Sequence, residues 1–208
     1  IEKAKELYGP ARMPYERIEP VAESFGNLDP AIDAREGDVP DNEWTGFHRI
    51  EKTLWVDNSL DGMAPVADQL LTDVTTLSNN VKLVAIEPAQ IANGAVDLLN
   101  EVSASKITGE EERYSHIDLL DFQANVDGSK EAFEAVKPIL SDQDADLAEQ
   151  IATRFDDVDN ALEPYRDGAG FVSYSQLTDD DTRKLSQSID ALAEPLSHVA
   201  EQVVVAGK

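Results

Sequence analysis

The chain has 208 residues and no cysteine, and its 42 Asp and Glu residues against 17 Lys and Arg residues give a formal charge of −25 at pH 7. These features exclude disulfides, thiolate metal sites and cysteine nucleophiles, and they disfavour nucleic acid and anionic lipid surfaces as partners. Hydrophobic residues make up 41% of the chain, enough for a folded core. No apolar run approaches the ~20 residues of a membrane-spanning helix, so no direct membrane insertion is predicted.

Apolar residues recur at spacings of three and four in almost every segment, whereas period-two runs rich in Val, Ile and Thr are scarce. This pattern predicts an all-α fold. The helices are expected, in chain order, at about residues 2–25, 43–56, 63–83, 88–105, 110–127, 129–140, 144–165 and 179–205. Short connections between long amphipathic helices favour antiparallel neighbours, and therefore an up-and-down helical bundle.

Prolines, glycines and acidic residues mark the interruptions of this pattern. The first helix is expected to be kinked or broken by its three prolines, Pro10, Pro14 and Pro20. An acidic loop is expected over residues 27–42, and Asp41 or Asn42 at its end can cap the next helix. A Gly-rich loop is expected at residues 167–170. Because the helical pattern already includes Ile1, we expect a leader, and an earlier helical segment, to precede this sequence.

A faint internal repeat accompanies the helical pattern. Residues 47–51 and 55–59 resemble residues 115–118 and 125–129. Duplication predicts a single domain over 1–208 with two related four-helix halves, 1–108 and 109–208. Chance similarity is the alternative, because a few matched letters are common in helical sequences.

The chain contains three histidines: His48, His116 and His198. In Phe47-His48-Arg49-Ile50-Glu51, the spacing of three places His48 and Glu51 on one helix face, where both can hold the same cation. The apolar and aromatic residues around them predict a buried helix, and a buried carboxylate needs a partner. That partner is a cation, a hydrogen-bond donor, or an arginine such as Arg49 or Arg113, so a purely structural pair stays open.

Six motifs follow one another along nearly the whole chain. They are Tyr-Glu-Arg-Ile-Glu-Pro at 15–20, Leu-Asp-Pro-Ala-Ile-Asp-Ala-Arg-Glu at 28–36, Gly-Phe-His-Arg-Ile-Glu at 46–51, Gly-Glu-Glu-Glu-Arg-Tyr-Ser-His at 109–116, Asp-Phe-Gln-Ala-Asn-Val-Asp-Gly at 121–128 and Gly-Phe-Val-Ser-Tyr at 170–174. Together they resemble the imelysin-like domain of the EfeO/EfeM family.

This resemblance implies a periplasmic or cell-surface iron-binding component of a bacterial ferrous-iron uptake system, built as a helical bundle. Its expected partners are the metal cation and the membrane permease and peroxidase-type components of that system. Full-length EfeO proteins also carry an amino-terminal cupredoxin domain, and no segment here resembles one. The chain is therefore similar to the short EfeM type, or to a domain of a longer protein.

The resemblance also implies a metal site assembled from separated segments. Carried over by motif, its ligands are Glu19, Asp33, His48, Glu51 and Glu111, with Glu110 and Glu112 competing for the last position. One imidazole with several carboxylates suits ferrous or ferric iron. Zinc, manganese and copper are alternative occupants, because this donor set does not by itself select one ion.

Two other functions stay open. Zinc peptidases place a second histidine within the metal motif, but Lys52 follows Glu51 here, which disfavours a metallopeptidase. Alginate or another polysaccharide could stack on Trp44 and Trp55, although their helical spacing is more typical of core residues. The charge of −25 also repels polyuronates.

Overall fold

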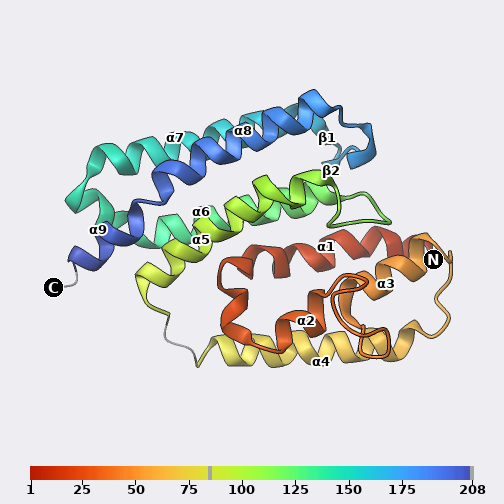
Figure 1. Ribbon diagram of the computed structural model, residues 1–208. Helices are drawn as coiled ribbons and strands as arrows, with labels where there is room; N and C mark the ends of the chain where they lie inside the picture. Colours follow the sequence, from red (N-terminus) through yellow and green to blue (C-terminus); the bar gives the residue numbers. More distant parts are fainter. Residues whose placement is uncertain (84–85, 207–208) are drawn as a thin grey trace.

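The computed structural model describes residues 1–83 and 86–206, and it confirms an all-α helical bundle (Figure 1). The elements are α1 (Glu2–Ile18), η1 (Glu19–Phe25), α2 (Leu28–Asp33), α3 (Gly46–Trp55), α4 (Met63–Val81), α5 (Pro88–Ala104), η2 (Lys106–Thr108), α6 (Asp118–Gln143), α7 (Ala145–Leu162), η3 (Glu163–Tyr165), β1 (Arg166–Asp167), β2 (Gly170–Phe171), η4 (Tyr174–Gln176), α8 (Asp179–Leu196) and α9 (Val199–Ala206). Here α denotes an α-helix and η a 3-10 helix. The strands β1 and β2 form one short antiparallel hairpin around the predicted Gly-rich loop.

Helices α5 to α8 form a four-helix bundle in which each helix contacts two others, and α9 packs against α5 and α6. We call α5 to α9 the C-terminal bundle. Its core is apolar and includes the fully buried residues Leu99, Val126, Ile151, Phe155 and Ile189. Burial of apolar surface is therefore sufficient to account for the association of these helices.

Helices α1 to α4 form a second layer on the bundle, which we call the N-terminal layer (Figure 1). Helix α1 packs along α6, while α2 and α3 lie between α1 and α4. This layer has a smaller core that includes Tyr8, Tyr15, Ile32 and Phe47. Helix α5 packs with the C-terminal helices, so the packing boundary falls between α4 and α5. The evolutionary relation between two halves stays a prediction.

The predicted break in the first helix is confirmed next to Pro20: α1 ends at Ile18, and the 3-10 helix η1 follows from Glu19 to Phe25, although α1 continues through Pro10 and Pro14. Other predicted boundaries in the N-terminal layer were wrong. The predicted loop at 27–42 begins with helix α2. The next helix starts at Gly46 after an N-cap at Thr45, without a side-chain cap hydrogen bond, so neither Asp41 nor Asn42 caps it.

The separate helices predicted at 110–127 and 129–140 were also wrong. Residues 111–115 form turns, and a single helix, α6, runs from Asp118 to Gln143. Gly128 is not a helix break: a Cβ there would lie 2.0 Å from the carbonyl oxygen of Arg17, so glycine allows α1 to approach α6 closely.

The helix predicted at 179–205 is in fact two helices. Helix α8 ends at Leu196 and α9 begins at Val199. Pro195 lies one residue before the end of α8, where its missing N–H removes one helical hydrogen bond. Among the residues described, no helix combines the length and the apolarity that crossing a bilayer requires.

Candidate metal centre

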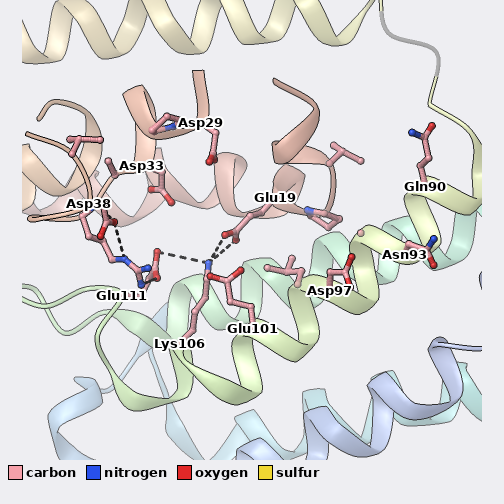
Figure 2. A pocket seen from close by; sticks show the side chains of 18 residues that line it. Glu19, Asp29, Asp33, Asp38, Gln90, Asn93, Asp97, Glu101, Lys106 and Glu111 are labelled. Carbon is pink, nitrogen blue, oxygen red and sulfur yellow. Dashed lines mark hydrogen bonds and ion pairs between the residues drawn. The ribbon is translucent and has the colours of Figure 1, made fainter. Parts of the chain in front are cut away.

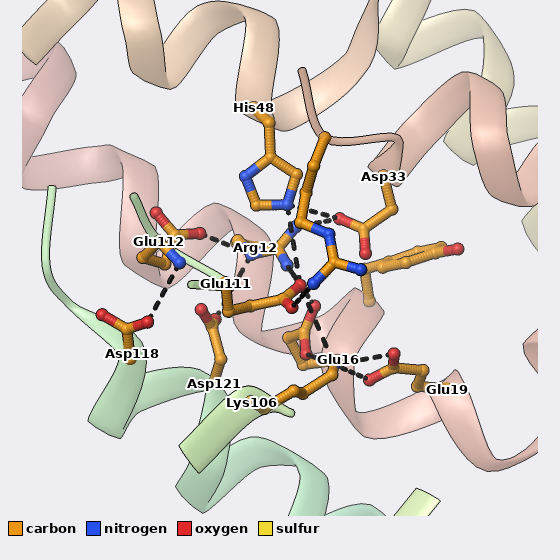
Figure 3. Close-up of polar contacts among 12 residues, drawn as sticks. Arg12, Glu16, Glu19, Asp33, His48, Lys106, Glu111, Glu112, Asp118 and Asp121 are labelled. Atoms are coloured by element: carbon orange, nitrogen blue, oxygen red, sulfur yellow. Dashed lines mark hydrogen bonds and ion pairs between the residues drawn. The ribbon is translucent and has the colours of Figure 1, made fainter. Parts of the chain in front are cut away.

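A cluster of charged side chains, all buried except the half-buried Asp33, lies where the N-terminal layer meets the C-terminal bundle (Figure 3). We call it the charged cluster. It comprises Arg12 and Glu16 of α1, Asp33 of α2, His48 and Glu51 of α3, Lys106 of η2, Asp118 and Asp121 of α6, and Glu111 and Glu112 of the turn before α6. Burying so many ionisable groups costs free energy unless they pair with one another or with a bound ion.

The approach of α3 to α2 positions His48. Gly46 has φ +82°, and a Cβ on it would lie 2.1 Å from the carbonyl oxygen of Ile32. Only glycine combines this left-handed conformation with so close a backbone contact. The start of α3 is therefore held against the end of α2, which brings His48 close to Asp33.

The two ring nitrogens of His48 face different partners. Nδ1 lies 3.2 Å from Oε2 of Glu51, whose Oε1 accepts hydrogen bonds from the backbone N–H groups of Tyr114 (2.9 Å) and Ser115 (2.8 Å). Nε2 lies 3.5 Å from Oδ1 of Asp33 and 3.6 Å from Oε1 of Glu111. Within the described residues, this buried Nε2 has no hydrogen-bond partner.

The surrounding carboxylates favour the charged imidazolium in the metal-free protein. Burial and the charge of Arg12 lower the pKa of His48, but Glu111, Glu51 and Asp33 outweigh them and raise it to about 9. Conversely, hydrogen bonding to His48 and the backbone N–H groups outweighs burial and lowers the pKa of Glu51. The carboxylate of Glu51 therefore stays ionised and holds the imidazole ring in place.

Arg12 is the central fixed cation of the cluster and is fully buried. Its guanidinium pairs with Asp33, contacts Glu16 at 2.7 Å and Glu111 at 2.8 Å through Nη2, and contacts Glu112 at 2.7 Å through Nε. Carboxylates on all sides thus fix this guanidinium in one position, since any movement would leave several buried charges without a partner.

Glu112, Asp118 and Asp121 lie on the α6 side of the cluster, away from solvent. Burial raises the pKa of Glu112 and of Asp121 well above the usual range, despite the opposing charge of Arg12. Burial likewise raises the pKa of Asp118. These acids are therefore biased toward the neutral form, which reduces the excess negative charge of the cluster.

A cleft of about 610 Å³ leads from solvent to the other side of the cluster, between α5 and the segment that includes η1 and α2 (Figure 2). Its acidic lining residues are Glu19, Asp29, Asp33, Asp38, Asp97, Glu101 and Glu111, and its basic lining residues are Arg35 and Lys106. The carboxylates attract cations, and those of Asp33 and Glu111 are shared between the cleft and the His48 site.

Four of the five residues predicted as metal ligands, all except Glu19, lie in two groups of three possible ligands that share His48. Donor atoms of Asp33, His48 and Glu111 all lie within 4.8 Å of one another, as do those of His48, Glu51 and Glu112. Glu51 approaches the other ring nitrogen of His48. Glu19 instead places both carboxylate oxygens 2.7 Å from the ammonium of Lys106.

Arg12 and Lys106 were not predicted from the sequence as members of the site. A signal for Arg12 exists, because Tyr8, Arg12, Tyr15 and Glu16 share one buried face of α1 at spacings of three and four. A charged pair at i and i+4 that shares a helix face with two tyrosines indicates a buried ion pair. Lys106 carries no comparable local signal, since its partners come from distant segments.

Comparison with known proteins gives the family. The profile of the imelysin family, peptidase M75, matches residues 1–199. The chain is 49% identical over 205 residues to an "Efem/EfeO family lipoprotein" of Staphylococcus haemolyticus, covering 96% of this chain and 71% of that protein. The chain therefore belongs to the imelysin family and, within it, to the EfeM/EfeO group.

Two further relatives carry functional names. The chain is 46% identical over 202 residues to "Iron uptake system component EfeM" of Bacillus subtilis, and 48% identical over 203 residues to "Iron uptake system component EfeO" of Escherichia coli K12. Each match covers 96% of this chain. The chain spans only about half the length of these two relatives, 52% and 54% respectively.

Proposed function

We propose that this chain binds an iron ion as the cargo of a bacterial iron-uptake system, through Asp33, His48 Nε2 and Glu111. The observation that carries the proposal is the buried Nε2 of His48, which has no hydrogen-bond partner among the described residues and faces two carboxylate oxygens at 3.5 and 3.6 Å. Metal–ligand bonds of about 2.0–2.2 Å suit three donor atoms grouped within 4.8 Å.

Glu51 supports this site from the opposite side of the imidazole ring. A carboxylate that accepts a hydrogen bond from Nδ1–H leaves the lone pair on Nε2 directed at the metal and makes that nitrogen a better donor. The alternative group, His48 with Glu51 and Glu112, lies away from the cleft, because neither glutamate lines it. An ion that arrives from solvent meets Asp33 and Glu111 first.

The chemistry of the donor set matches iron. Two carboxylates and one imidazole suit Fe²⁺ or Fe³⁺, and zinc, manganese or copper can bind to the same types of ligand. Binding of the metal replaces the proton on Nε2, so we expect one proton to be released from His48 at neutral pH. Ion selectivity then depends on geometry and on metal availability outside the protein.

The names of the relatives support the physiological role. Two relatives are named iron uptake system components and a third is named a lipoprotein. We propose accordingly that the chain works outside the cytoplasm, periplasmic or at the cell surface, and delivers iron to a membrane permease with a peroxidase-type component. This delivery is a proposal about the whole uptake system.

A binding role also agrees better with the site than peptide hydrolysis does. Among the described residues, the groups of three suitable metal ligands contain only one histidine, His48. Zinc peptidases use a second histidine in the motif. Polysaccharide binding is disfavoured because seven carboxylates line the cleft and would repel polyuronates.

The test is metal binding by chelator-stripped protein, measured under anaerobic conditions with Fe²⁺ and then with Mn²⁺ and Zn²⁺ in competition. We expect one equivalent of metal in the wild type, and loss of that equivalent in His48→Ala. The matched control is His198→Ala, because that side chain is 60% exposed and lies outside the cluster.

Two variants at the cleft test whether the carboxylates of Asp33 and Glu111 bind the metal. Asp33→Asn and Glu111→Gln keep the shape of each side chain and remove its charge, so both should weaken Fe²⁺ binding strongly. Equal metal content in the wild type and in His48→Ala would refute the site and show nonspecific binding to the acidic surface.

A further inference from the structure

Lys106 occupies the inner end of the cleft. It is the first residue of η2, shortly after α5 ends, and its side chain is only 5% exposed. Its ammonium lies 2.7 Å from both carboxylate oxygens of Glu19, 3.2 Å from Oε2 of Glu16 and 3.8 Å from Oε1 of Glu111. Lys106 therefore neutralises the carboxylates that a bound metal ion would meet (Figure 2).

One carboxylate oxygen is shared by three positively charged groups. Oε1 of Glu111 lies 2.8 Å from Nη2 of Arg12, 3.6 Å from Nε2 of His48 and 3.8 Å from Nζ of Lys106. A metal ion bound to this oxygen at about 2.1 Å would come within a few ångström of both Arg12 and Lys106. Like charges at such distances in a buried site repel strongly, so movement of one of the two side chains would relieve part of this repulsion.

Arg12 cannot be the one that moves. It is fully buried, and its guanidinium is in contact with carboxylates on α1, α2 and α6 and in the turn before α6. Lys106, in contrast, lines the open cleft, and its ammonium sits on a flexible stem of four methylene groups. The carboxylates of Asp97 and Glu101 lie along the same wall of the cleft, on the preceding turns of α5 (Figure 2).

We propose that Lys106 is an exchangeable counter-ion of the metal site. Its ammonium holds Glu19 and Glu111 in the metal-free protein, and it moves toward Glu101 when a divalent or trivalent cation binds. Glu19 then becomes free to join Asp33, His48 and Glu111 around the ion. This inference rests on the proposed function, since it assumes that the cation binds at His48.

The exchange accounts for the placement of Glu19. Glu19 lines the cleft, but both of its carboxylate oxygens contact Lys106, and Oε2 also accepts a hydrogen bond of 2.8 Å from Nδ2 of Asn125. Departure of the ammonium would leave Oε1 without this partner. A cation that replaces it keeps the buried charge balanced, so the exchange avoids a state in which the carboxylates are uncompensated.

Chemical labelling of the wild-type protein tests the movement directly. An amine-acetylating reagent is applied to the chelator-stripped protein and to the protein saturated with Fe²⁺, and the acetylation of each lysine is measured by peptide mass spectrometry. We expect the labelling of Lys106 to increase several-fold with Fe²⁺, because its ammonium leaves its buried partners. Lys130, which pairs with Asp156 and Asp159 away from the cleft, is the internal control and should not change.

Affinity measurements on variants test whether the ammonium of Lys106 competes with the metal ion for the same carboxylates. Removal of the competing charge in Lys106→Gln should tighten Fe²⁺ binding on the order of tenfold, whereas Lys106→Arg keeps the charge and should not tighten it. The matched control Lys130→Gln should bind as the wild type does. Unchanged or decreased labelling of Lys106 in Fe²⁺-saturated wild type, or unchanged or weaker binding by Lys106→Gln, would overturn the proposal.

The outcomes separate this inference from the proposed function. A wild-type protein that binds no Fe²⁺ overturns both. A wild-type protein that binds Fe²⁺ through His48, but shows no increase at Lys106 and no gain in Lys106→Gln, overturns only the role of Lys106. The labelling experiment needs no substitution, so it remains decisive even if Lys106→Gln folds poorly.

Discussion

Away from the face of α6 that meets α1, the C-terminal bundle buries apolar side chains, whereas α1 of the N-terminal layer also buries charged ones. Inside the bundle, α7 contributes only apolar residues to the buried set, among them Ile151, Phe155 and Val158. Inside the layer, α1 buries Arg12 and Glu16 next to Tyr8 and Tyr15. The bundle is thus stabilised by apolar burial, whereas the attachment of α1 depends on a balance of charges.

This difference separates stability from function. An apolar core is insensitive to ions and moderate changes of pH, so the bundle can serve as a constant support. A buried charged cluster is costly when unbalanced, and it responds to any cation that enters. The charged cluster lies where the cleft opens, beside Asp33 and Glu111.

The largest expected effect is that of Arg12→Met. The substitution keeps the bulk of the side chain but removes the guanidinium that pairs with several buried carboxylates. Removal of one partner from a buried ion pair typically costs about 3–5 kcal/mol of the free energy of unfolding. The measurement is chemical denaturation at pH 7 with a chelator present, followed by circular dichroism. A loss below about 1 kcal/mol would contradict the view that charge balance attaches α1.

Ile151→Ala tests the apolar core of the bundle, as Arg12→Met tests the charged cluster. The side chain is fully buried on α7, and its truncation should lower the free energy of unfolding by about 2–5 kcal/mol through lost contacts and a cavity. Because α7 does not contribute to the cleft or the cluster, Fe²⁺ affinity at a temperature where the variant is folded should not change. Changed affinity would show that the two regions are coupled rather than separate.

The same contrast explains what could be predicted from the sequence. The helices at 63–83 and 88–105 were predicted to within two residues of α4 and α5, because amphipathic periodicity and a proline at the start are local properties. Helix α6 was divided wrongly, because Gly128 serves the contact with Arg17 and not a turn. That contact joins two helices far apart in the sequence.

Some residues of the candidate site could also be predicted from the sequence, and others could not. The pair His48 and Glu51 follows from helical spacing, and Asp33 and Glu111 came from family resemblance. Helical spacing on α1 pairs Arg12 with Glu16, but it cannot show that Arg12 also pairs with Glu111, because these two residues are 99 positions apart in the chain. Charge balance is a property of the folded interior, so only the assembled structure reveals which carboxylates Arg12 and Lys106 neutralise together.

A pH titration of the metal-free protein should show an intermediate effect. His48 has a folded-state pKa of about 9, above its value in an unfolded chain. Its stabilising contribution is therefore fully present below about pH 6.5 and is lost as the pH rises through 9, by about 3 kcal/mol at most. The free energy of unfolding of the wild type should fall over this interval, and His48→Gln should lack this component. Equal slopes in the two proteins would contradict the imidazolium pairing.

The smallest expected effect is that of Arg17→Met, in the same interface between α1 and α6 as Arg12. Arg17 Nη2 lies 2.9 Å from Oδ2 of Asp127, so by distance alone this pair equals the contacts of Arg12. The side chains are 42% and 31% exposed, however, and water solvates both charges when the pair is broken. The expected loss is therefore only about 0–1 kcal/mol under the conditions used for Arg12→Met. Similar losses in the two variants would show that burial does not decide the strength of charge pairing in this interface.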